Sequence, residues 1–270
     1  MPVLKDITLG QYFPGDTIVH RLDPRTKLIL TILYIALLFI AKSYVSYGLV
    51  FLFLVICILL SRIRLKAILS GLKPLVILIV ITALLNLFYT RGEHLLFRVW
   101  RISVYWEGVR TAVTMAFRIM MLVTGTLMLT YTTSPLQLTD GMEKLLNPLK
   151  KLHIPVHELS MMMSIALRFI PTLIEETDKI MSAQKARGAE FDTGNLIQKA
   201  KAMLPLLVPL FISAFRRADE LATAMESRCY HGGEGRTKMK VLKMARRDWI
   251  ALGCGAVLLA LTSLLRRLGL

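Results

Sequence analysis

Residues 44–60 read YVSYGLVFLFLVICILL, a run of seventeen residues without a charged side chain. A helix needs about 20 mostly apolar residues to cross the hydrocarbon core of a bilayer, and about 17 at the short end. The run therefore predicts a membrane-spanning helix. It ends at Ser61 and Arg62, where the chain becomes polar again.

Similar apolar runs recur along the chain, at residues 28–41, 75–89, 119–131 and 249–265. Asn86 interrupts the second of these, and the third extends backwards through Arg118 toward Glu107. Several reach spanning length only with flanking residues and snorkelling arginines. Of the 270 residues, 55% are hydrophobic, which is too apolar for an ordinary soluble domain. We expect an all-α polytopic membrane protein with about five transmembrane helices.

The net charge of +16 lies mostly at the edges of these runs. The loop after residues 44–60 holds four basic residues and no acidic one among them: Arg62, Arg64, Lys66 and Lys73. The positive-inside rule places this loop in the cytoplasm, together with the N-terminus and residues 132–248, and places residues 90–106 outside. Five arginines are exceptions to the rule: Arg91, Arg98, Arg101, Arg266 and Arg267.

Membrane lipid explains this charge better than nucleic acid does, because anionic headgroups lie where the charge is. Residues 1–27 lack the apolar core of a cleavable signal peptide. The three cysteines suggest no pairing: Cys57 and Cys254 lie in apolar runs, and Cys229 faces the reducing cytoplasm.

The cytoplasmic stretch carries two apolar stripes at helical spacing. The first runs from Leu159 to Gln184 and the second from Leu196 to Met225. Their opposite faces are charged, with Glu175, Glu176, Asp178 and Lys179 in the first and Lys199, Lys201, Arg216, Arg217, Asp219 and Glu220 in the second. We predict two long amphipathic helices that cover each other, with a shorter surface helix before them at residues 134–149.

Prolines lie inside both predicted helices, Pro171 in the first and Pro205 and Pro209 in the second, and predict bends. Gly188 and Gly194 flank the turn between them. The expected domains are residues 1–131 with four spans, residues 132–248 with the cytoplasmic helices, and residues 249–270 with the last span.

Each long helix ends in a small residue, an arginine and another small residue. The triplets are Ala186-Arg187-Gly188 and Ser227-Arg228-Cys229. A basic head between small neighbours fits a groove on another protein without steric conflict. The alternative is a plain cap, since arginine in a last helical turn complements the helix dipole. Repetition of the pattern favours docking on a partner.

Catalytic and cofactor motifs are absent from the sequence. No G-x-x-x-x-G-K-[ST] phosphate loop is present, so we expect no ATP hydrolysis by this chain. Residues 232–235 are glycine-rich but lack its lysine, and predict a flexible turn. His153 and His157 have the spacing of two metal ligands, but Pro155 separates them and no third ligand is near. We expect a non-catalytic protein without a metal or cofactor.

The chain resembles the T component of energy-coupling factor (ECF) transporters, the EcfT/CbiQ family. Four groups of residues carry the resemblance: His20-Arg21-Leu22-Asp23-Pro24-Arg25-Thr26-Lys27, Ser134-Pro135, Ala166-Leu167-Arg168-Phe169-Ile170-Pro171 with Ala183-Gln184-Lys185-Ala186-Arg187-Gly188, and Ala224-Met225-Glu226-Ser227-Arg228-Cys229-Tyr230. The resemblance implies long coupling helices that dock on two cytoplasmic ABC-type ATPase subunits, with the motif arginines at Arg187 and Arg228. Family members more often have glycine where this chain has Cys229.

The resemblance also implies a separate small membrane subunit, the S component, which captures the substrate. We expect it to bind an apolar face rich in methionine, which adapts to different partners: Met162, Met163, Ala166, Phe169, Ile170 and Leu173. The expected cargo is a vitamin. Two alternatives stay open: a dedicated cobalt or nickel importer, and a protein that carries substrate in its own spans. The last would need polar groups in the membrane, for which the candidates are Asn86, Glu107, Arg110 and Arg118.

Overall fold

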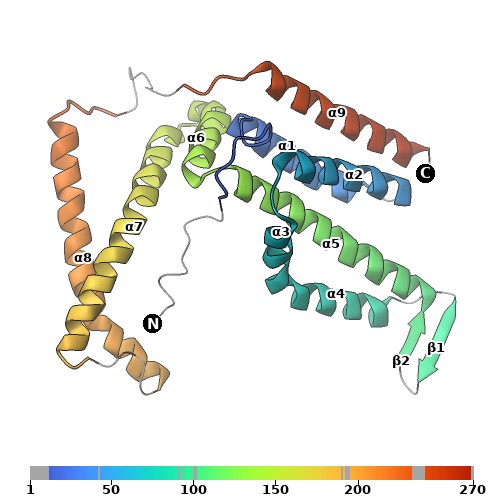
Figure 1. The fold of residues 1–270 in the computed structure, drawn as a ribbon, viewed down its shortest axis with the longest axis horizontal. Helices are drawn as coiled ribbons and strands as arrows, with labels where there is room; N and C mark the ends of the chain where they lie inside the picture. Colours follow the sequence, from blue (N-terminus) through green and yellow to red (C-terminus); the bar gives the residue numbers. More distant parts are fainter. Residues whose placement is uncertain are drawn as a thin grey trace. The chain divides into compact units, whose positions relative to one another are not determined.

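The computed structural model describes residues 12–41, 43–90, 92, 94–99, 102–189, 191, 195–232 and 241–268 (Figure 1). The chain divides into two compact units. We call residues 10–142 with 242–270 the membrane unit, and residues 143–241 the helix-pair unit; residues 1–9, which group with the latter, are outside the described residues.

The membrane unit is built from helices that pack side by side, α1 against α9 and α4 against α5 (Figure 1). Its elements are α1 (Pro24–Ile40), α2 (Tyr44–Ser61), α3 (Leu65–Leu72), the 3-10 turn η2 (Lys73–Leu75), α4 (Val76–Tyr89), β1 (Leu95–Val99), β2 (Ile102–Tyr105), α5 (Trp106–Thr132), most of α6 (Pro135–Leu146) and α9 (Arg246–Arg267). Four described helical segments are long and apolar enough to span a membrane: 44–61, 65–89, 106–132 and 246–267. With 17 residues, α1 is at the short end of spanning length. A multi-pass helical membrane protein is therefore confirmed.

The span predicted at residues 75–89 is confirmed, because the helical segment 65–89 is long and apolar enough to cross a membrane and continues through Asn86. The Asn86 Nδ2 donates to the backbone carbonyl of Thr82, one turn earlier in the same helix (2.8 Å). An amide that is satisfied within its own helix does not need water or a partner helix. The helix therefore continues to Tyr89.

The core of the membrane unit lies where α1, α2 and α5 meet. Leu37, Leu38 and Val50 are fully buried there, beside Met121 of α5. Close approach of α4 and α5 depends on Gly108, because a Cβ at this position would lie 2.9 Å from the backbone oxygen of Leu87. The packing thus holds the spans together through small and apolar residues.

A β-hairpin lies in the stretch predicted as an external loop. Strands β1 and β2 are antiparallel, and Val99 pairs with Ile102. The strands have only five and four residues, which is too short for a sequence pattern to distinguish them from a loop. The hairpin is a small addition to a helical fold.

The helix-pair unit contains two helices of 31 residues, α7 (Val156–Ala186) and α8 (Leu196–Glu226), which pack against each other. Before them come the end of α6 and the 3-10 helix η3 (Asn147–Leu152). The predicted start of α6 is confirmed, since Ser134 and Gln137 form a reciprocal capping pair. The three prolines lie inside α7 and α8 as expected; the bends stay a prediction.

Candidate docking surfaces

The end of α7 is closed by backbone hydrogen bonds. Gly188 has a φ of +87°, and the amide of Ala189 donates to the carbonyl of Gln184 (3.0 Å). This bond spans six residues and, with a left-handed residue before it, defines a Schellman cap. Glycine fits here because it adopts positive φ without a steric penalty.

The end of α8 repeats this geometry. Cys229 has a φ of +53°, and the amide of Tyr230 donates to the carbonyl of Met225 (3.1 Å). The left-handed residue is again the third member of the triplet. The similarity that the sequence showed at Arg187 and Arg228 is therefore also a similarity of backbone geometry.

Both arginines directly precede the left-handed residue and are exposed, as are the other four triplet residues: Ala186, Gly188, Ser227 and Cys229. Within the described residues, neither guanidinium makes a hydrogen bond or an ion pair. The backbone amides, and not the arginine side chains, satisfy the last carbonyls of each helix. The two guanidinium groups are thus available to a partner protein. They do not cap their helices through side-chain hydrogen bonds.

A polar contact joins α7 to α8. The Glu176 carboxylate accepts from the Ser213 hydroxyl and from Nη2 of Arg217 (2.9 Å). Ser213 is buried, and the hydrogen bond from its hydroxyl, helped by Arg217, lowers the pKa of Glu176. Sequence periodicity assigned Glu176 and Arg217 to the charged outer faces. Only the packing of the two helices reveals that they meet.

The apolar face predicted to bind the substrate subunit lies on α7. Met162 and Met163 are about half exposed, at 53% and 55%, and Ala166 is exposed. Phe169, Ile170 and Leu173 are partly buried. The face is therefore open at its methionine end and partly covered at the other.

A second apolar face lies on α8 and remains largely uncovered. Its exposed members follow helical spacing: Leu204, Val208, Phe211, Ile212 and Phe215. The rings of Phe211 and Phe215 stack with centroids 6.5 Å apart. The predicted mutual covering of the two stripes is thus incomplete, and an apolar patch stays exposed on α8, as is typical of binding surfaces.

The segment from His20 to Lys27 has a structural role that the sequence did not indicate. The amide of Asp23 donates to Oδ1 of the buried Asp248 at the start of α9 (2.8 Å). Nζ of Lys27 donates to the carbonyls of His20 (3.0 Å) and Thr132 (2.8 Å). These bonds connect the starts of α1 and α9 to the end of α5.

Two of the polar candidates in the spans are engaged on α5, Arg110 near the hairpin end and Arg118 at the middle of the helix. Arg118 donates from Nε to the Tyr47 hydroxyl (2.7 Å), and Arg110 donates to the Tyr44 hydroxyl. Glu107 and Arg110 both line a hollow of about 340 Å³. Arg110, Arg118 and Asn86 are thus hydrogen-bonded within the protein, and the candidates do not line a polar path for a substrate through the spans.

The two histidines do not form a metal site with each other. Nδ1 of His157 contacts Oε1 of Glu143 at 3.1 Å, and His153 ends η3 with a φ of +60°. Among the described residues no group of three or more potential ligands has a geometry that would hold a metal. In the predicted glycine-rich turn, Gly232 has a φ of +96°, and residues 233–235 lie outside the described residues. Gly194, predicted to flank the turn between α7 and α8, also lies outside them.

Comparison with known proteins agrees with the fold. The model of the CbiQ family, described as cobalt transport protein, matches residues 15–239. Proteins named energy-coupling factor transporter transmembrane protein EcfT are similar along nearly their whole length. Those of Clostridium kluyveri, Thermosediminibacter oceani and Bacillus subtilis are 56%, 51% and 47% identical, over 98% of this chain in each case and 98%, 99% and 100% of theirs. The chain therefore belongs to the CbiQ/EcfT family of energy-coupling factor transporter transmembrane proteins.

Proposed function

We propose that this chain is the scaffold and energy-coupling subunit of an ECF-type importer. Its two long helices dock on two cytoplasmic ABC-type ATPase subunits through Arg187 and Arg228. ATP-driven motion of these subunits shifts the helix ends, and the helices transmit the motion to a small substrate-binding membrane subunit. The chain itself catalyses no reaction in this proposal.

The observation that carries the proposal is the matching geometry of the two helix ends. Two similar caps, each presenting an exposed arginine without a partner in the described residues, suit two similar grooves. Small neighbours such as Ala186 and Ser227 let groove walls approach the guanidinium closely. Charge-assisted hydrogen bonds to arginine are strong and geometrically specific.

The contact between Glu176, Ser213 and Arg217 supports a lever role. Motion is transmitted between distant sites only through elements that are held together. This contact joins the C-terminal half of α7 to the C-terminal half of α8. It therefore connects the two helix segments that end in the docking arginines. A shift at one arginine would thus reach the partner helix.

The exposed apolar faces supply the proposed contact with the substrate subunit. Met162 and Met163 offer flexible apolar side chains, which suit a surface that accepts different partners in turn. Phe169 lies further along the same face. We propose that the S component binds here and that its cargo is a vitamin.

Arg187→Ala and Arg228→Ala test the docking step in the reconstituted complex. Both side chains are exposed, so each substitution changes the stability of the isolated chain by only about 0.5 kcal/mol or less. We expect membrane insertion to be unchanged and ATP-dependent uptake to be lost. Lys179→Ala, also exposed on α7, is the control and should retain uptake. Full uptake by both arginine variants would refute the proposal.

Phe169→Glu tests the second surface. We expect it to weaken retention of the S component in a pull-down while the ATPase subunits remain bound through the helix ends. Thr177→Val is the control. Thr177 is partly buried on the same helix, and the substitution adds no charge, so both partners should stay bound. Loss of the ATPase subunits with retention of the S component would reverse the assignment of the two surfaces.

A further inference from the structure

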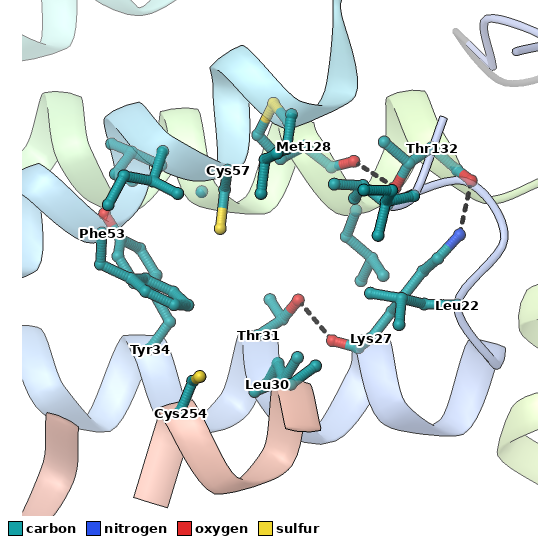
Figure 2. A pocket seen from close by; sticks show the side chains of 18 of the residues that line it. Leu22, Lys27, Leu30, Thr31, Tyr34, Phe53, Cys57, Met128, Thr132 and Cys254 are labelled. Carbon is teal, nitrogen blue, oxygen red and sulfur yellow. Dashed lines mark hydrogen bonds between the residues drawn. The ribbon is translucent and has the colours of Figure 1, made fainter. Parts of the chain in front are cut away.

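The membrane unit contains an apolar cavity of about 510 Å³ between α1, α2, α5 and α9 (Figure 2). The cavity is open on one side, because Ile18, Ile250 and Cys254 in its wall are exposed, so a hydrocarbon chain can enter it from the membrane. Its volume is within the range of ligand-binding pockets. The cavity lies wholly within one compact unit.

The hydroxyl groups in the cavity wall are already satisfied. The Tyr34 hydroxyl donates to the Met121 carbonyl (3.0 Å), and the Thr31 hydroxyl donates to the Lys27 carbonyl (2.8 Å). The Thr132 hydroxyl likewise donates to a carbonyl of its own helix, that of Met128 (2.7 Å). A polar cargo would find no free hydroxyl here, whereas a hydrocarbon chain would lose no hydrogen bonds by entering.

Positive charge marks one end of the cavity. Lys27 lies in the wall and is 5% exposed, and its ammonium makes hydrogen bonds to backbone carbonyls but no ion pair within the described residues (Figure 2). Arg247 lies at the same end, is exposed, and has no hydrogen-bond partner in the described part of the chain. The carboxylate of the nearby Asp248 is occupied by the amides of Asp23 and Ala245.

We propose that this cavity binds one anionic phospholipid, with an acyl chain among the apolar residues and the phosphate at Arg247. The basic end lies beside the starts of α1 and α9, which the positive-inside rule places on the cytoplasmic side. The ligand therefore belongs to the cytoplasmic leaflet, where anionic lipid attracts basic residues at the membrane edge. This inference does not depend on the proposed coupling function.

Native mass spectrometry of the purified full-length chain tests the proposal, with phosphatidylglycerol and phosphatidylcholine of identical acyl chains as probes. We expect one tightly held phosphatidylglycerol per chain and weaker binding of phosphatidylcholine. Arg247→Gln should weaken phosphatidylglycerol binding about fivefold. Arg246→Gln is the matched control, because Arg246 is exposed but does not line the cavity.

Ala251→Phe places a ring in the cavity and should abolish retention of the lipid. Ala256→Phe makes the same change on the exposed side of α9 and should leave retention intact. Equal retention by the two variants would identify the lipid as part of the surrounding annulus and overturn the proposal. Equal binding of both headgroups, or of free oleic acid, would overturn it as well.

A second measurement uses only native residues. The sulfur atoms of Cys57 and Cys254 point into the cavity from opposite walls (Figure 2). Cys229 is exposed in the helix-pair unit and serves as an internal reference. Phosphatidylglycerol should slow alkylation of Cys254 several-fold more than phosphatidylcholine does, with no difference at Cys229. Equal rates at Cys254 in the two lipids would refute the site without any variant.

Discussion

Replacing Cys229 by glycine tests the geometry of the second helix end. Cys229 holds a φ of +53°, and a left-handed backbone costs a residue with a side chain about 1 to 2 kcal/mol. The side chain is exposed, so little packing is lost with it. Glycine loses more conformational entropy than cysteine when the cap forms, and this offsets part of the gain. We therefore expect Cys229→Gly to stabilise the cap by about 1 kcal/mol.

The opposite change at the first helix end provides a matched comparison. A Cβ added at Gly188 meets nothing within 4 Å, so Gly188→Ala introduces backbone strain without a clash. Its φ of +87° predicts a loss of about 1 kcal/mol. The two changes should therefore have opposite effects of similar size.

Residue-resolved hydrogen exchange measures these effects at the amides that close the caps. A change of about 1 kcal/mol alters the opening equilibrium about fivefold. Cys229→Gly should slow exchange of the Tyr230 amide by this factor and leave that of Ala189 unchanged. Gly188→Ala should accelerate exchange at Ala189. Cys229→Ser keeps a side chain at the strained position and should have no effect. If serine slows exchange as much as glycine does, the backbone explanation is wrong.

Further predictions concern other contacts of the described residues. A double-mutant cycle with Glu176→Gln and Arg217→Gln should give a coupling of about 0.5 to 1 kcal/mol in thermal unfolding; a coupling of zero would show that the pair does not hold α7 to α8. Asp248→Asn should destabilise the membrane unit by about 2 kcal/mol, because the amide accepts only one of two backbone bonds; an unchanged midpoint would contradict this. Burial lowers the pKa of His20, so its neutral form stabilises the fold above a pH of about 6.5 and this contribution is lost as the pH falls. The pH dependence of the unfolding temperature should flatten in His20→Asn, and identical profiles would exclude this role. Ala186→Leu should retain its helix but prevent assembly with ATPase subunits; normal assembly would argue against a narrow groove.

Hydrophobic periodicity predicted the helices well because burial and membrane insertion both require apolar residues on one face of a helix. These residues recur every three to four positions in the sequence. The start of α8 at Leu196 follows from the first residue of its apolar stripe. The spans at residues 44–61 and 246–267 likewise follow from local composition. These features depend on neighbours in the sequence.

The features that the sequence did not reveal depend on residues far apart. Asp248 follows Asp23 by 225 positions, and their hydrogen bond has no local pattern. Glu176 and Arg217 carry the charges of an ordinary solvated face, and a single sequence gives no reason to pair them. The left-handed cap at Cys229 was hidden for a different reason, because glycine is the usual residue in that conformation.

The contact between α7 and α8 lies at a similar distance along the chain from the two arginines. Arg187 follows Glu176 by eleven residues, and Arg228 follows Arg217 by eleven. The helical part of each arm runs ten residues from Glu176 to Ala186 and nine residues from Arg217 to Glu226, about 15 and 14 Å. Two arms of similar length, with the same cap at each end, suit two partners that are themselves alike. A structure that docked on a single partner would have no reason to match the two arms.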